Sequence, residues 1–107
     1  MPRQATTDDD VVKDTEAGRY ELNADGGLAG IALYEEDGDR ITFVHTVIAQ
    51  AFQGRGLGVR LTRAALDDAR RRGQTIVPEC PYIADLLQTH RDWDDIVDPA
   101  HLPDRSG

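Results

Sequence analysis

The chain has 107 residues, of which 39% are hydrophobic and 30% are charged, and its 12 Lys and Arg against 20 Asp and Glu give a formal net charge of -8. This length predicts one compact domain, and the absence of any apolar run near the roughly 20 residues of a membrane helix predicts a cytoplasmic protein that does not bind membranes. Its acidity disfavours nucleic-acid binding, and its single cysteine excludes an internal disulfide and a multi-cysteine zinc site.

The N-terminal half of the chain predicts an antiparallel meander. Residues 18–23 and 28–34 have the composition of strands, and a turn-forming run over residues 23–27 separates them. The Asp-Gly pair at 37–38 predicts a tight turn into residues 40–49, a β-branched and aromatic run that predicts a central strand buried on both sides. The alternation places Ile41, Phe43, His45 and Val47 on one face of this strand, and Val44 and Ile48 on the other.

The C-terminal half predicts two helices around a short strand. Apolar residues at helical spacing predict a helix over residues 56–72, which Gly73 ends. Residues 75–77 predict a short buried strand that Pro78 stops. A second helix is expected from about residue 81 to residue 90, with its apolar residues three and four apart on the inner face.

Together these elements predict an α+β domain over residues 11–98. It contains the meander, a helix, a short parallel strand and a second helix packed on the sheet. Residues 1–10 have little apolar content and residues 99–107 include two prolines, so we expect both ends to be mobile.

A glycine-rich loop, Gln53–Gly58, lies between the expected central strand and the first helix. This arrangement turns backbone N–H groups and a helix N-terminus toward an anion, and glycine allows a close approach. Val59 and Leu61 exclude the dinucleotide pattern, and the nucleotide P-loop sequence is absent. Residues 53–72 carry six arginines against two aspartates, so local positive potential is concentrated here. Taken alone, the loop is equally well explained as a structural crossover.

Three short motifs follow one another along the chain. They are His45-Thr46 in the expected central strand, Gln53–Gly58 with the pattern Q/R-x-x-G-x-G/A, and Pro78–Tyr82 with the pattern P-x-C-x-Y/F. In this order and spacing they resemble the small single-domain members of the GNAT N-acetyltransferase superfamily. The resemblance spans about residues 18–93.

The resemblance implies acetyl-CoA as the cofactor, with its pyrophosphate on the loop amides and its pantetheine arm paired with the strand. The cofactor-binding residues that it implies are Val47, Ile48, Ala49, Gln53, Gly54, Arg55, Gly56, Leu57, Gly58 and Arg60. Arg63 is a further candidate for the phosphates. The implied reaction is acetyl transfer to an amine, and the acidic surface favours a cationic small molecule or a lysine-bearing peptide. We expect a monomer or weak homodimer.

His45, Cys80 and Tyr82 are the candidate catalytic residues. Cys80 precedes Pro81 and is predicted at a helix N-cap, where a thiol pKa falls, although burial as a small hydrophobe remains open. From sequence alone His45 fits a core histidine, whereas the resemblance implies a general base beside the acetyl group. Cys80 would position the thioester or carry the acetyl group, and Tyr82 would protonate the CoA thiolate or pack as an aromatic.

Two other functions fit the same residues. Val47 stands where members of the family often have Glu, which makes a non-catalytic CoA- or acyl-CoA-binding module the main alternative. An acidic interaction protein with a purely structural glycine loop is the third. Binding of CoA and turnover separate the three.

Overall fold

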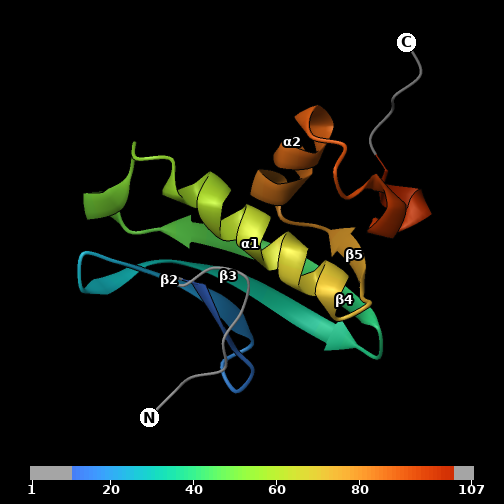
Figure 1. Ribbon diagram of the computed structural model, residues 1–107, viewed down its shortest axis with the longest axis horizontal. Coiled ribbons are helices and arrows are strands. Elements are labelled where there is room, and N and C mark those ends of the chain that lie inside the picture. The colour runs from blue at the N-terminus through green and yellow to red at the C-terminus, as the bar shows by residue number, and fades with distance from the viewer. Residues whose placement is uncertain (1–10, 103–107) are drawn as a thin grey trace.

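Five strands form one sheet in the order β1-β2-β3-β4-β5, and two helices pack against it (Figure 1). The structure is a computed structural model that describes residues 11–102. The mobile end predicted at 1–10 and residues 103–107 of the mobile end predicted at 99–107 lie outside the described residues. The strands are β1 (Val11–Asp14), β2 (Arg19–Ala24), β3 (Gly27–Asp37), β4 (Arg40–Ile48) and β5 (Thr75–Pro78). The helices are α1 (Leu57–Arg71) and α2 (Pro81–Thr89), with short 3-10 turns at Gln50–Phe52, Asp94–Ile96 and Pro99–His101.

The predicted α+β class and the antiparallel meander are confirmed. Strands β1 to β4 pair antiparallel and β5 joins β4 in parallel. A two-residue turn at Asp25 (φ 52°) and Gly26 (φ 80°) connects β2 to β3, and such turns need positive φ at both positions. Strand β1 was not predicted, because four residues with a lysine and an aspartate carry too little apolar pattern to mark a strand.

The core lies between one face of the sheet and the two helices. Helix α1 crosses the sheet in Figure 1 and buries Leu61, Ala65 and Ala69 completely, as its predicted apolar stripe requires. Gly73 follows its end with φ 71°, as expected for a helix stop. Trp93 is 1% exposed and donates a hydrogen bond from Nε1 to Asp67 of α1, which ties the segment after α2 to that helix.

Strand β4 differs from the prediction because it contains a β-bulge. Tyr34 pairs with Phe43 and Leu33 pairs with His45, so Val44 is an extra residue in β4. The bulge shifts the alternation by one residue, which turns His45 and Val47 away from α1. His45 is exposed and Val47 is 42% exposed, so the expectation of a strand buried on both faces is wrong. Alternating apolar residues predict faces only while the pairing stays regular.

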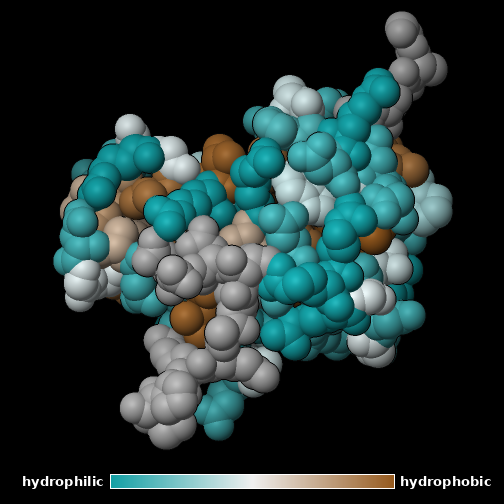
Figure 2. Space-filling model, viewed as in Figure 1, coloured by the Kyte–Doolittle hydropathy of each residue, from teal (hydrophilic) through white to brown (hydrophobic). Residues whose placement is uncertain are grey.

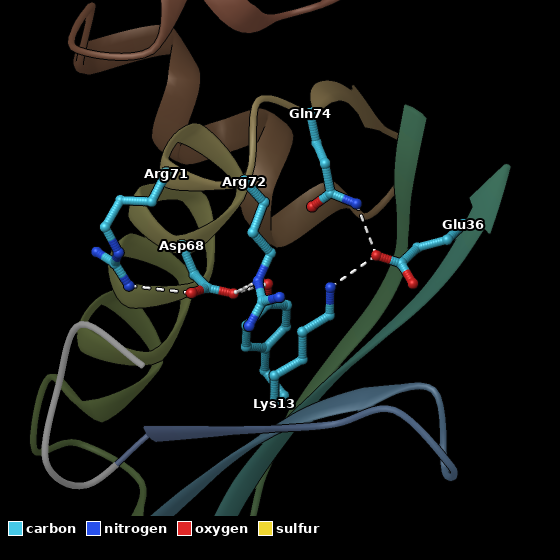
Figure 3. A network of polar contacts seen from close by, with 7 residues as sticks. Lys13, Glu36, Asp68, Arg71, Arg72 and Gln74 are labelled. Atoms are coloured by element: carbon cyan, nitrogen blue, oxygen red, sulfur yellow. Dashed lines mark hydrogen bonds and ion pairs between the residues drawn. The ribbon is translucent and has the colours of Figure 1, made fainter. Parts of the chain in front are cut away.

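A buried carboxylate joins α1 to the sheet. Asp68 of α1 is 3% exposed and accepts a hydrogen bond from Tyr20 Oη of β2 at 2.7 Å. It also accepts from Arg71 at 3.0 Å and from Arg72 at 2.6 Å, and Figure 3 shows the carboxylate between the two arginines. A buried charge is tolerated only when it is paired and hydrogen-bonded, as this one is.

A second polar cluster holds β1 against the end of β3 (Figure 3). Lys13 Nζ and Gln74 Nε2 each donate to Glu36 Oε2 at 2.6 Å. Burial raises the pKa of Glu36, but the hydrogen bonds from Lys13 and Gln74 lower it more, and the net shift of this pKa is downward. The stability from this cluster is therefore present above the ordinary carboxyl pKa and is lost as pH falls through the lowered value.

Tyr20 and Tyr34 give a matched pair for testing these contacts. Their rings lie 5.4 Å apart, and both hydroxyls are buried, but Tyr34 Oη has no hydrogen-bond partner within residues 11–102. We expect Tyr20→Phe to lower the free energy of unfolding by about 1–3 kcal/mol, since it leaves Asp68 short of a donor, while Tyr34→Phe changes it little or raises it. Urea unfolding at pH 7 measures both, and equal losses would contradict the described contacts.

The two buried tyrosines also predict how the free energy of unfolding changes at alkaline pH. Burial and then Asp68 raise the pKa of Tyr20, and burial raises the pKa of Tyr34 to about 12, from an ordinary value of 10.0. A raised pKa contributes stability below the unfolded value that is lost as pH rises toward the folded one. Stability should fall above about pH 10, and less steeply in Tyr34→Phe than in the wild type.

Candidate functional site

The site begins where β5 stops pairing with β4. The last pair in their register is Phe43 with Pro78, and Pro78 has no N–H to continue the ladder. The N–H of Cys80 still donates to the carbonyl of Phe43 at 2.7 Å, and the chain then turns into α2. Residues 44–48 of β4 therefore continue along a sheet edge that β5 no longer covers.

The hydrogen bonds of β4 show which backbone groups face this edge. The N–H of Ala49 donates to the carbonyl of Ala29 at 2.7 Å, and the pairing is regular back to His45. Because backbone groups alternate along an antiparallel strand, those of Thr46 and Ile48 point away from β3. Gln53 Nε2 donates to the carbonyl of Ile48 at 3.2 Å, consistent with this orientation. The edge thus presents Thr46 and Ile48 to an extended ligand.

The glycine loop closes this edge and starts α1. Gly54 and Gly56 have φ values of 81° and 74°, which side chains rarely adopt, and Gly56 is the N-cap of α1. No acidic residue lies in the first turn of α1. Its first N–H groups have no acceptor inside the helix, so this end of α1 is electropositive.

The edge and the loop enclose a pocket of about 480 Å³. It is lined by His45, Thr46, Val47, Ile48, Phe52, Gln53, Gly54, Gly56, Leu57, Gly58 and Tyr82. The volume lies in the range of small-molecule sites, about 300–1,000 Å³. Figure 2 shows hydrophobic surface among hydrophilic residues at the end of the molecule where β4 leads into α1. Two lining residues, Phe52 and Thr46, were not predicted as site residues, although Thr46 belongs to the His45-Thr46 motif.

Tyr82 forms the wall of the pocket opposite β4. Pro81 occupies the first turn of α2 and places Tyr82 beside the first turn of α1, with 41% of the residue exposed. A Cβ atom at Gly58 would lie 1.8 Å from Tyr82 Oη. A side chain at position 58 would therefore displace the Tyr82 ring, whose hydroxyl lies over the start of α1.

Cys80 lies beneath the pocket. It is the N-cap of α2, as predicted, but its side chain makes no capping hydrogen bond. It is 1% exposed, and its Sγ lies 3.2 Å from Thr46 Oγ1. Thr46 lines the pocket, so the thiol contacts a pocket residue but is not itself part of the lining. His45 and Tyr82 both line this pocket.

The three arginines considered for the phosphates lie in different surroundings. Arg55 bonds Asp25 at 2.9 Å instead of lining the pocket. Arg63 lies over the ring of Trp93, with its Cζ 5.2 Å from the ring centroid. Arg60 is exposed on α1.

Within residues 11–102, no group of three His, Cys, Asp or Glu side chains could hold a metal ion. In the same part of the chain, neither helix combines the length and the apolar character needed to cross a membrane.

Comparison with known proteins gives one family. A sequence model of the family described as GCN5-related N-acetyl-transferase matches residues 19–96. The fold is similar to the solution NMR structure of a GCN5-like protein from Staphylococcus aureus, with a TM-score of 0.65 and 16% sequence identity over 89% of this chain and 90% of that chain. No curated protein matches the chain.

The contact between Gly58 and Tyr82 predicts that one substitution has different effects in two backgrounds. Ala is a better helix former than Gly by about 1 kcal/mol, so Gly58→Ala should stabilise α1 once the tyrosine is absent, in Tyr82→Ala. In the wild type the new methyl must displace the Tyr82 ring, which cancels that gain. Thermal unfolding of the wild type, Gly58→Ala, Tyr82→Ala and the double variant measures the difference. Identical effects of Gly58→Ala in both backgrounds would refute the contact.

Proposed function

Because the chain belongs to the GCN5-related N-acetyltransferase family, we propose that it transfers an acetyl group from acetyl-CoA to an amine. The observation that supports this function is the meeting of three features in one pocket. They are the uncovered edge of β4, the glycine loop and the electropositive start of α1. An elongated ligand with amides at one end and phosphates at the other complements all three.

The residues present fit acetyl-CoA. The N–H groups at the start of α1 and around Gly54 and Gly56 suit the pyrophosphate. The backbone groups of Thr46 and the N–H of Ile48, whose carbonyl accepts from Gln53, suit the amides of the pantetheine arm, which can add to the sheet edge like a short strand. This proposal assigns the arm to Thr46 and Ile48, whereas the resemblance implied Val47, Ile48 and Ala49. Val47 faces β3 with its backbone and lines the pocket beside them.

We assign the proton transfers to His45 and Tyr82. When bound, acetyl-CoA supplies the acetyl group as a reactive thioester. His45 accepts the proton that the acceptor amine must lose, directly or through a water molecule. Tyr82 Oη donates a proton to the departing sulfur. Both side chains line the pocket, which satisfies the first requirement for these roles.

The position of Cys80 favours direct transfer over an acetyl-cysteine. The thiol is 1% exposed and in contact with Thr46, so it supports the pocket floor. A nucleophilic role would require it to reach past Thr46. The proposed acceptor is a cationic small molecule or a lysine-bearing peptide, supported by the net charge of -8.

Binding of acetyl-CoA is the first test. Ligand at about 100 times its Kd adds about 2.7 kcal/mol of stability, which should raise Tm by roughly 10 °C or more in a domain of this size. Gly56→Ala should reduce this shift, because its φ of 74° is strained for alanine. Gly38→Ala is the matched control: its φ is 61°, it lies in the β3–β4 turn, and it should lower Tm but keep the shift.

Absence of any shift at millimolar acetyl-CoA would contradict the function and favour a purely structural loop. A shift without turnover on any amine would favour the non-catalytic binding module.

Turnover tests the assignment of His45 and Cys80. We expect His45→Gln to lower kcat by roughly 100-fold or more, the range found for general-base catalysis, with the Kd of acetyl-CoA little changed. Cys80→Ala should keep acetyl transfer, with some loss of stability from the buried site. An acetyl group trapped on Cys80 of the wild type after rapid quench, and detected by mass spectrometry, would contradict direct transfer.

A further inference from the structure

The cation of the glycine loop is bound by a carboxylate from another part of the sheet. Arg55 is the only charged residue in Gln53–Gly58. Its Nη1 donates to Asp25 Oδ2 at 2.9 Å, and its guanidinium lies over the ring of Phe52, 5.5 Å from the centroid. Gly54 and Gly56 on either side line the pocket, but Arg55 does not. The loop glycines thus line the pocket, while the guanidinium of Arg55 is bound to Asp25 outside it.

The partner carboxylate is held in place by a tight turn. Asp25 and Gly26 form the two-residue connection between β2 and β3, and Ala24 pairs with Gly27 across it. Both turn residues have positive φ, as a two-residue hairpin turn of this kind requires. The hairpin therefore brings the Asp25 carboxylate to the loop from 30 residues earlier in the chain.

We propose that Asp25 competes with the phosphates of the ligand for Arg55. When CoA binds, Arg55 releases this carboxylate and binds a phosphate instead. This inference rests on the proposed function. A guanidinium makes the same charge-assisted hydrogen bonds to carboxylate and to phosphate. The side chains of Arg55 and Asp25 are 47% and 65% exposed, and exposed pairs of this kind are weak enough to be displaced.

The exchange makes the β2–β3 turn a determinant of CoA affinity. Asp25 lowers the affinity in two ways, because it holds Arg55 away from the pocket and because its negative charge repels phosphate. The opposite hypothesis is that Asp25 aims Arg55 at the ligand. The two hypotheses predict opposite changes in the affinity for CoA when this carboxylate is removed: competition predicts tighter binding, and aiming predicts weaker binding.

Calorimetric titration with CoA distinguishes the two hypotheses by the change in Kd. Asp25→Asn keeps the turn, since Asn-Gly is a preferred sequence for it, and removes the charge. We expect the Kd of CoA to fall about two- to fivefold, the equivalent of a weak exposed pair, and to fall less or not at all in the Arg55→Ala background. Asp37→Asn is the matched control: it makes the same change in net charge at the other end of β3 and should leave the Kd unchanged.

A second probe separates phosphate exchange from a general effect on the pocket. Pantetheine lacks the phosphates, so its Kd should be the same in the wild type and in Asp25→Asn. An unchanged or weaker affinity of Asp25→Asn for CoA overturns the exchange while leaving the proposed function intact. An equal gain for pantetheine, or an equal gain in Asp37→Asn, also overturns it. Absence of CoA binding to every variant overturns the proposed function itself.

Discussion

The candidate site depends on the end of pairing between β4 and β5. Pro78 cannot donate to the ladder, and Cys80 and Pro81 lead the chain directly into α2, so β4 extends beyond its neighbour. An uncovered sheet edge has backbone groups that need partners, and proteins normally cover such edges. Here Gln53 covers one carbonyl and the glycine loop approaches the rest, which leaves an edge that a ligand with amides can complete.

The β-bulge at Val44 determines what this edge presents. Without the extra residue, the alternation that begins at Phe43 would turn the backbone of His45 and Val47 toward the opening. With it, the opening receives the backbone of Thr46 and Ile48, while the Thr46 side chain covers Cys80. The proline that ends β5 and the bulge in the neighbouring strand β4 thus act together, and each changes only local geometry.

The parts of this structure that follow local rules could be predicted from the amino-acid sequence. The apolar stripe of α1, its stop at Gly73 and the N-cap at Cys80 are properties of single segments, and all three are confirmed. The bulge was not predictable, because it depends on how β3 and β4 pair. The position of Arg55 was not predictable either, because its partner Asp25 lies in a hairpin turn that only the folded sheet brings to the loop. Residues from all three motifs line the pocket, and tertiary contacts decided the orientation of its side chains.

The two ends of α1 are held by different kinds of contact. The C-terminal half is fixed by the buried hydrogen bond from Tyr20 to Asp68 and by the partly buried one from Trp93 to Asp67. At the other end Tyr82 lies against Gly58, and the loop before it carries the exposed pair of Arg55 and Asp25. Buried bonds of this kind contribute more to stability than an exposed ion pair. The helix can therefore remain anchored to the sheet while the loop changes partners, which separates the stability of the fold from the adjustments that ligand binding requires.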